Sequence, residues 1–319
     1  MPSWMMIAIG LVLLVAGGES LVRGAVATAQ RLGVSPLMIG LTLVGFGTST
    51  PELITSVEAA LIGSPGIAVG NVVGSNTANI LLILGAAAVI HPLATSRAAL
   101  MRDGGAMLVA ALACLAVVLT GHLARPAGAA LILLLAAYIV YTYRRERVVH
   151  DASAKMHEAE ATMMAPPRGV GFALGLLLAF GGITLTIAGA AFLVDGAIAL
   201  ARGFGISETV VGLTIVSVGT SLPELVTSVM AALRRQGDVA FGNVLGSNIY
   251  NVLGILGVTA VVKPIPVPPE IAAVDIWVML AASVALLLFS ITGWRLNRWE
   301  GGAFLAAYAG YVAYLATAA

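Results

Sequence analysis

Two motifs occur twice in this chain of 319 residues, and both recur at the same offset of 172 positions. Residues 47–53, GTSTPEL, return as GTSLPEL at 219–225, and residues 70–76, GNVVGSN, return as GNVLGSN at 242–248. Around the first motif fifteen of twenty-five positions are identical, and around the second eleven of seventeen are. A repeat of this length predicts two structurally equivalent halves, each of which carries one acidic, hydroxyl-rich segment.

The composition indicates an integral membrane protein. Hydrophobic residues make up 60% of the sequence and charged residues only 10%, against about 25% charged residues in a soluble domain. Because a helix needs about 20 apolar residues to cross a bilayer, we predict an all-α membrane protein with ten transmembrane helices. The predicted spans are residues 4–30, 35–62, 66–90, 103–121, 126–143, 169–202, 207–233, 238–262, 271–292 and 301–318. The hydrophilic residues 144–168 would link a first five-helix repeat, 1–143, to a second, 169–319.

The distribution of basic residues predicts the orientation. With the N-terminus outside, thirteen of the sixteen Lys and Arg residues fall in inner loops and adjoining helix ends, and only Arg125, Arg202 and Lys263 fall outside. Because cytoplasmic loops carry an excess of basic residues, we expect both termini outside the bacterial inner membrane and the linker in the cytoplasm. Since five is odd, the second repeat enters the membrane from the opposite side. The two repeats would then be inverted, with a substrate site at their interface.

The first motif of each repeat supplies oxygen atoms at membrane depth. On a helix Thr48 and Ser49 lie four and three residues before Glu52, so two hydroxyls and a carboxylate share one face. Pro51 has no N–H and clashes with the carbonyl of Gly47, so the helix should be interrupted there. The second copy repeats the pattern before Glu224 and Pro223. Carbonyl, hydroxyl and carboxylate oxygens are hard ligands, which suit Na⁺ or Ca²⁺ rather than a soft transition metal.

The second motif places further polar groups opposite the first. Ser75 and Asn79 are four residues apart, as are Ser247 and Asn251, and by symmetry with the glutamates we expect these four side chains to contact the ion. Other members of the motif suit packing instead. We expect the four asparagines to form hydrogen bonds between helices and the four glycines to let helix backbones approach closely. These residues are Asn71, Asn76, Asn243 and Asn248, and Gly70, Gly74, Gly242 and Gly246.

An alternative interpretation of Glu52 and Glu224 is a pair of neutral carboxyls satisfied by hydrogen bonds. A carboxylate inside the membrane costs on the order of 3 kcal/mol on insertion scales, and two of them placed symmetrically beside hydroxyls favour a functional site. The acids Glu19, Glu58 and Asp195 fall outside the repeated pattern. For these three, gating, a salt bridge and a solvated helix end remain open.

Several classes of function are excluded by absent signals. The single Cys114 rules out an internal disulfide framework and a cysteine-based metal cluster. The sequence has no phosphate-binding loop, nucleophile motif or metalloprotease motif, so we expect no enzyme and no cofactor. It also lacks a basic patch interleaved with aromatic residues, so no nucleic acid is expected. The predicted partners are the lipid bilayer and small inorganic cations, with no obligate protein partner.

The paired motifs GTSxPEL and GNxxGSNxxN, present twice, resemble those of the calcium/cation antiporter superfamily, and of its prokaryotic sodium/calcium exchanger branch in particular. The resemblance implies a central site in which Glu52 and Glu224 are the main Ca²⁺ and Na⁺ ligands. It implies further oxygens from Thr48, Ser49, Thr220, Ser221, Ser75, Ser247, Asn79 and Asn251, and from the main-chain carbonyls of Gly45 and Ser217. Several relatives, including potassium-dependent exchangers, carry an aspartate at one of the positions that Asn79 and Asn251 occupy here. Because both positions are amides in this chain, potassium co-transport is not expected.

The sequence therefore predicts a secondary antiporter that exchanges Na⁺ for Ca²⁺ by alternating access, in which the first and sixth spans slide against the rest of the bundle. The family, by resemblance, moves three Na⁺ per Ca²⁺, which would make exchange electrogenic. Two alternatives remain open. Protons could drive exchange by protonating the two glutamates, or the chain could be a passive cation channel, although channels more often place rings of ligands around an oligomer axis.

Overall fold

The computed structural model describes residues 1–35, 38, 39, 42, 45–95, 97, 100–148 and 171–318. Helices account for most of it, several of them with short π-helical segments marked η. The first half contains α1 (Ser3–Arg31), α3 (Gly45–Thr48), α4 (Thr50–Leu61), α5 (Pro65–Ala78), η2 (Asn79–Leu84), α6 (Gly85–Ile90), β1 (Leu93–Ala94), η3 (Leu100–Gly104), α8 (Gly105–Leu119), β2 (His122–Leu123) and α9 (Arg125–Val148).

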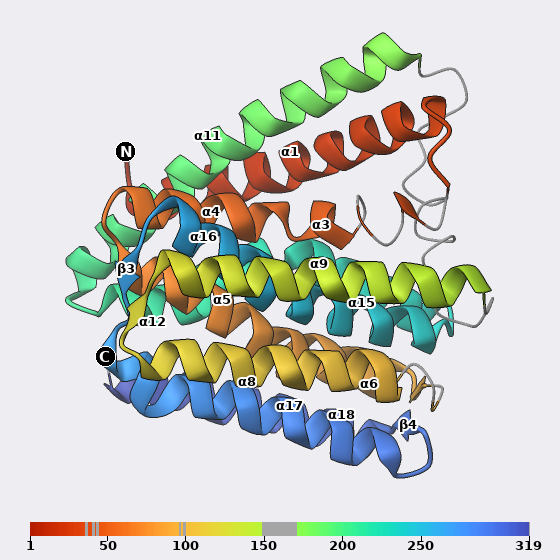
Figure 1. Ribbon diagram of the computed structural model, residues 1–319. Helices are drawn as coiled ribbons and strands as arrows, with labels where there is room; N and C mark the ends of the chain where they lie inside the picture. The colour runs from red at the N-terminus through yellow and green to blue at the C-terminus, as the bar shows by residue number, and fades with distance from the viewer. Residues whose placement is uncertain are drawn as a thin grey trace.

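The second half repeats this order of elements. It contains α11 (Phe172–Phe204), α12 (Glu208–Val211), η4 (Gly212–Val216), α13 (Ser217–Thr220), α14 (Leu222–Leu233), α15 (Gly237–Ile249), η5 (Tyr250–Leu256), α16 (Gly257–Val262), β3 (Ile265–Pro266), η6 (Ile271–Asp275), α17 (Ile276–Ile291), β4 (Arg295–Leu296) and α18 (Arg298–Ala318). Figure 1 shows these helices as one elongated bundle.

The helix lengths identify a multi-pass membrane protein. Within the described residues, seven helices are long and apolar enough to cross a bilayer, and the bent pair α12–α13 and α14 would make eight. The remaining predicted spans also contain helix, in α3–α4 and in α18. Helix α9 continues to Val148, so the predicted linker begins inside a helix. Residues 149–168 of that linker lie outside the described part of the chain.

In each half, the helix that carries the acidic motif is interrupted at the serine that precedes Thr50-Pro51 or Leu222-Pro223. Helix α3 ends at Thr48 and α4 begins at Thr50, with Ser49 between them. In the second half α13 and α14 meet at Ser221 with a bend of 51°. The two serines have nearly the same backbone angles, φ −88° and ψ 10° against φ −83° and ψ 12°. The predicted interruptions are confirmed, and they follow from the missing proline N–H.

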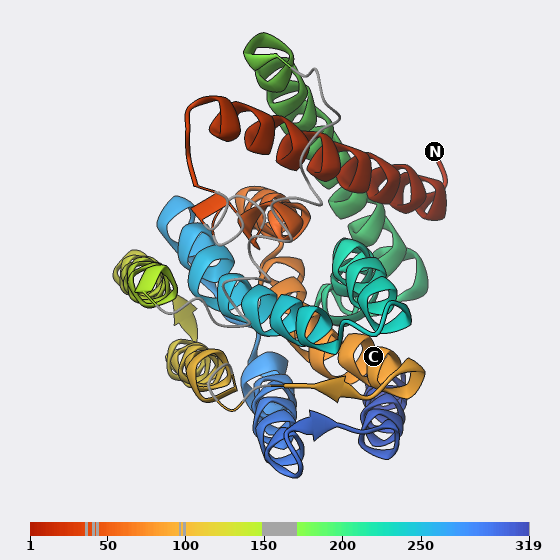
Figure 2. The same ribbon diagram turned by 90° about the vertical axis from the view of Figure 1, so that its right-hand side faces the viewer.

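Helices α1 and α11 pack against each other along their length and form a layer on one side of the bundle (Figures 1 and 2). Glycines spaced seven residues apart face each other across this contact. A Cβ atom at Gly17 would lie 2.7 Å from the main-chain nitrogen of Thr186, and one at Gly189 would lie 2.7 Å from that of Leu14. Because real Cβ atoms do not approach so closely, the two backbones are in direct contact, as small residues allow between membrane helices.

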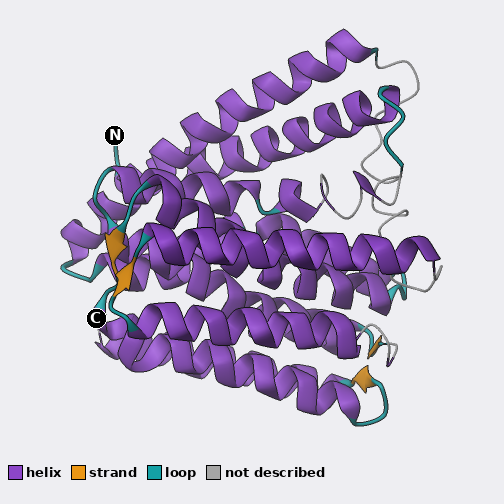
Figure 3. Ribbon diagram, viewed as in Figure 1, coloured by secondary structure: helices purple, strands orange, loops and turns teal. Residues whose placement is uncertain are grey.

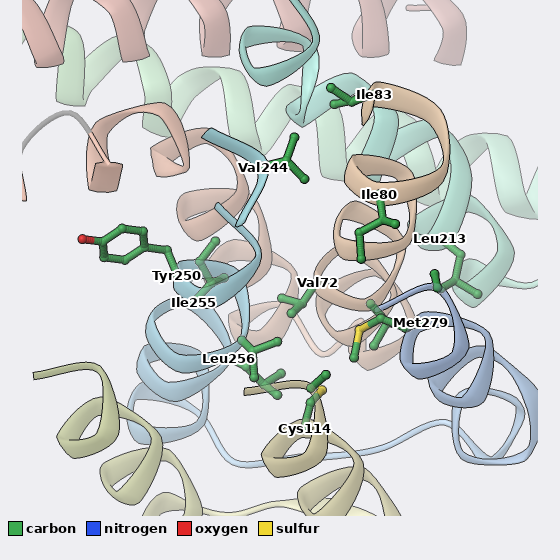
Figure 4. Packing of buried hydrophobic residues seen from close by; sticks show 14 of the residues in the cluster. Val72, Ile80, Ile83, Cys114, Leu213, Val244, Tyr250, Ile255, Leu256 and Met279 are labelled. Atoms are coloured by element: carbon green, nitrogen blue, oxygen red, sulfur yellow. The ribbon is translucent and has the colours of Figure 1, made fainter. Parts of the chain in front are cut away.

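The core surrounds α5 and α15, the two most deeply buried helices. Figure 4 shows part of it, in which Val72 and Ile80 of the first half belong to the same cluster as Leu213 and Met279 of the second. The expected close approach of helices at the second motif occurs at Gly70 and Gly74, which face main-chain atoms of Thr209 and Leu213. At Gly246 the close approach stays a prediction, because residue 41, the counterpart of the Leu213 that Gly74 meets, lies outside the described part of the chain.

Two antiparallel pairs of two-residue strands were not predicted. Strand β1 pairs with β4, with Leu93 opposite Leu296, and β2 pairs with β3, with His122 opposite Pro266. Each pair joins a loop of the first half to a loop of the second. The pairs lie at opposite ends of the bundle, as Figure 3 shows in orange. They form in loops, where the backbone N–H and C=O groups have no helical partners and form hydrogen bonds with a neighbouring loop instead.

Candidate cation site

The two glutamates of the repeated motif lie buried in the middle of the bundle, in the first turns of α4 and α14. Glu52 and Glu224 are each only 1% exposed. The Ser221 hydroxyl donates a hydrogen bond to Oε1 of Glu52 (3.0 Å), and the Ser49 hydroxyl donates one to Oε1 of Glu224 (3.4 Å). The Ser247 hydroxyl also donates to Oε1 of Glu224 (3.4 Å). Each carboxyl is therefore held by a serine of the opposite half.

An asparagine in each half ties the acidic helix to its neighbour. Asn71 Nδ2 donates to the main-chain oxygen of Glu52 (3.2 Å) and to the hydroxyl of Ser56 (2.9 Å). The equivalent Asn243 donates to the main-chain oxygen of Glu224 (3.4 Å) and to the Ser228 hydroxyl (3.1 Å). The prediction of hydrogen bonds between helices is confirmed for these asparagines. They fix the turn that carries each glutamate.

Further contacts cross between the halves around the same centre. The Thr220 hydroxyl donates to Oδ1 of Asn71 (3.1 Å), and the Ser75 hydroxyl donates to the main-chain oxygen of Ser217 (3.3 Å). Asn76 and Asn248 donate to each other's main-chain oxygens, both at 3.4 Å. Several polar side chains at this centre are thus paired with partners from the opposite repeat.

Five buried oxygen atoms of the glutamates and asparagines in the two motifs have no hydrogen-bond partner in the described structure. They are Oε2 of Glu52 and of Glu224, and Oδ1 of Asn76, Asn79 and Asn251. Leaving a buried acceptor unsatisfied costs about 1–3 kcal/mol, and more for a charged group. The oxygens of Glu52, Glu224, Asn79 and Asn251 are two carboxylate and two amide oxygens, one of each from each half, and these are the kinds of donor that a hard cation prefers. The described residues contain no group of three or more His, Cys, Asp or Glu side chains that could hold a metal ion, so this set differs from a transition-metal site.

The other predicted site residues differ in burial and in hydrogen bonding. Ser49, Ser75, Ser217, Thr220, Ser221 and Ser247 are buried and take part in the hydrogen bonds above. Thr48 is only partly buried and lines a cavity next to the site. Gly45 begins α3 and follows residues 43 and 44, which lie outside the described part of the chain.

A cavity of about 470 Å³ lies between α1, α3–α4 and α14. Its lining includes Thr48, Pro51 and Pro223 at the helix interruptions, and Glu19 and Arg23 on α1. The guanidinium of Arg23 donates to Oε1 of Glu19 through Nη2 (2.7 Å) and Nε (3.0 Å). Of the interpretations left open for Glu19, the structure therefore supports the salt bridge.

A second repeated acid was missed in the sequence. Asp103 accepts a hydrogen bond from the phenol of Tyr138 (3.2 Å), and Asp275, 172 positions later, accepts one from Tyr311 (2.8 Å). Asp103 also forms a salt bridge with the adjacent Arg102 (2.6 Å). Through these tyrosines the two aspartates join α9 and α18 to the bundle. The common offset was the signal that could have identified them.

Comparison with known proteins agrees with this geometry. The model of the sodium/calcium exchanger protein family matches residues 2–144 and 174–317. The chain is 34% identical to the sodium/calcium exchanger MaX1 of Methanosarcina acetivorans, over 98% of each chain, and 37% identical to the putative antiporter CaxA of Alkalimonas amylolytica, over 96% of each. Among solved structures it resembles the sodium-calcium exchanger NCX_Mj, with a TM-score of 0.64, 31% identity, and coverage of 98% of this chain and 99% of that one. The chain therefore belongs to the sodium/calcium exchanger family of membrane cation antiporters.

Proposed function

We propose that this protein exchanges Na⁺ for Ca²⁺ across the membrane through the site between Glu52 and Glu224. The observation that carries the proposal is the pair of buried carboxyls whose Oε2 atoms lack hydrogen-bond partners in the described structure. The amide oxygens of Asn79 and Asn251 lack partners too, and they lie on η2 and η5, which pack against α14 and α4. Two carboxylates balance the charge of one Ca²⁺ or of two Na⁺. A site that either load can neutralise can bind the two ions alternately, which is what an exchanger requires.

The proposed architecture is ten spans in two inverted five-helix repeats. Strand β1 and its counterpart β3, 172 positions later, belong to ribbons at opposite ends of the bundle (Figure 1). Parallel repeats would bring equivalent loops to the same end. The reciprocal hydrogen bonds of Asn76 and Asn248 also support a pseudo-twofold axis between them.

Alternating access is supported by a difference between the two halves. Helix α11 packs along α4, whereas the cavity of about 470 Å³ lies in the equivalent position between α1 and α14. This difference supports a site that ions approach through the cavity on one side and that α11 covers on the other. Because the backbones of α1 and α11 touch at their glycines, we propose that these two helices move together and open the opposite path when they slide.

The proposed orientation has both termini outside, so the cavity and the β1–β4 ribbon face the cytoplasm of a bacterial inner membrane. In this orientation Leu32, which follows α1 and is 69% exposed, lies on the cytoplasmic face. Ile62, which follows α4 and is 47% exposed, lies on the outer face. In a Cys114→Ala background, a membrane-impermeant thiol reagent added to whole cells should label a cysteine at position 62 and not one at position 32. Labelling of both from one side would contradict the inversion.

The coupling ion is tested with purified protein in liposomes. We expect Ca²⁺ uptake to follow an imposed Na⁺ gradient, to be unaffected by removing K⁺ at clamped potential, and to accelerate with an inside-positive potential when Na⁺ leaves. The last result is expected for three Na⁺ per Ca²⁺, with the third Na⁺ held by hydroxyl and amide oxygens. Uptake driven by a pH gradient without Na⁺ would instead establish proton-driven exchange. Ca²⁺ flux that needs no counter-ion would establish a channel.

A further inference from the structure

The cavity beside the site carries a pair of opposite charges that the exchange reaction itself does not require. Among the described residues that line it, Glu19 and Arg23 are the only charged ones, and the others are apolar, glycine, proline or threonine. Both side chains line the cavity and are partly exposed, Glu19 by 54% and Arg23 by 40%. They lie on α1, one helix away from the interruption that precedes Glu52.

Stability does not explain this pair. An exposed ion pair four residues apart on a helix contributes little to stability, whereas ionised side chains within a membrane span are costly. Both hydrogen bonds of the arginine reach the same oxygen, Oε1, in an otherwise apolar cavity. Charges in a cleft with low-dielectric walls act over a longer range than charges in open water, and they change the local concentration of ions.

The pair is also absent from the other half. The residues 172 positions later are Ala191 and Asp195, and Asp195 is exposed on α11. Inverted repeats therefore give the two access paths different charges: a neutral ion pair on the cavity side and a single carboxylate on the other.

We propose that Glu19 and Arg23 set the electrostatic attraction of inorganic cations into the cavity-side access path, and thereby the apparent affinity of the exchanger from that side only. The proposal rests on the proposed function of the central site. Neither residue is assigned as a ligand of the bound ion. Glu19 attracts the approaching cation, and Arg23 opposes it, so that the ion can enter the path and also leave it.

The test compares four proteins that give the same cavity three different net charges. Arg23→Gln leaves a net charge of −1, the wild type and the double variant Glu19→Gln/Arg23→Gln are neutral, and Glu19→Gln leaves +1. Everted membrane vesicles give the half-saturating cation concentration on the cytoplasmic side, and right-side-out vesicles give that on the outer side. Half-saturation does not depend on how much protein folds, so a loss of yield leaves the comparison intact.

At low ionic strength we expect Glu19→Gln to raise the cytoplasmic half-saturating Ca²⁺ about three- to tenfold, Arg23→Gln to lower it by a similar factor, and the double variant to stay near the wild type. Because a divalent ion experiences twice the electrostatic energy, the factor for Ca²⁺ should be about the square of that for Na⁺. The outer values should not change, and added salt should shrink the shifts. Arg202→Gln, which removes an exposed arginine at the far end of α11, is the matched control and should leave the cytoplasmic value unchanged.

A purely structural pair gives a different pattern. If Glu19→Gln and Arg23→Gln both weaken exchange and the double variant is no better, or if the values on both sides shift together, the inference is wrong while the proposed function stands. If the wild type itself exchanges no Ca²⁺ for Na⁺, the proposed function fails first.

Discussion

Replacing either buried glutamate by glutamine tests the cation site most directly. In Glu52→Gln the side chain keeps its shape and its Oε1 can still accept the hydrogen bond of Ser221, which is 3.0 Å long. The change removes the negative charge and leaves Glu224 as the single carboxylate opposite a divalent ion. The perturbation is therefore mainly electrostatic.

Its magnitude follows from the depth of the site. At an effective dielectric constant of about 20, unit charges about 4 Å apart interact by about 4 kcal/mol, and a divalent ion interacts about twice as strongly. Ion hydration and the amide dipole offset part of this loss. We expect a net cost of at least about 3 kcal/mol, which raises the half-saturating Ca²⁺ concentration by about two orders of magnitude.

The assay is Na⁺-driven uptake of labelled Ca²⁺ into proteoliposomes, together with thermal unfolding of the purified protein. Glu52→Gln and Glu224→Gln should lose uptake to the same extent, and Glu58→Gln, on the same helix but outside the repeated motif, should retain it. Ca²⁺ at about one hundred times the wild-type Kd should stabilise the wild type by about 2.7 kcal/mol, and at the same concentration this stabilisation should fall to about 0.4 kcal/mol or less in both glutamine variants. Normal uptake in Glu52→Gln, or equal loss in Glu58→Gln, would refute the site.

Three further substitutions test how the surroundings hold the site. Gly182→Ala should lower the free energy of unfolding by about 1–3 kcal/mol, because the added Cβ atom would lie 2.6 Å from a main-chain oxygen of α1. Its control, Gly181→Ala, adds a Cβ atom to open space and should leave thermal unfolding unchanged. Asn71→Ala removes the asparagine's hydrogen bonds to the turn that carries Glu52. Stability should fall and the half-saturating Ca²⁺ concentration should rise. An unchanged half-saturating concentration would contradict the role of Asn71 in positioning Glu52. Tyr311→Phe removes the hydrogen bond to Asp275 and should lower stability by about 1–3 kcal/mol without changing ion selectivity, which exchange assays with Na⁺, K⁺ and H⁺ gradients would check.

The sequence by itself determined the features that depend on local chemistry and on the repeat. The interruptions at Ser49 and Ser221 follow from the prolines two residues later, and both were predicted. The oxygen-rich character of the site follows from the residue types in the two motifs. The helical, membrane-embedded class follows from the long apolar segments, because their lengths match the bilayer.

The pairing of side chains was decided by the tertiary structure. From the sequence, Ser49 and Glu52 should share one helix face, three residues apart. The helix is interrupted at Ser49, so that face is not continuous, and the Ser49 hydroxyl instead donates to Glu224 of the other half. A contact between residues 175 positions apart depends on how two helices cross, which no local pattern contains.

The difference between the two sides of the site also lies beyond the sequence. A repeat with fifteen identical positions in twenty-five predicts equivalent halves, yet the cavity lies beside α1 and α14, and α11 packs along α4 instead. In the proposed inverted arrangement, the two repeats can pack in two ways that exchange their roles, and the sequence is compatible with both. Only the packing of α1 and α11 against the rest of the bundle decides where the cavity lies, because that choice depends on the relative position of whole helices.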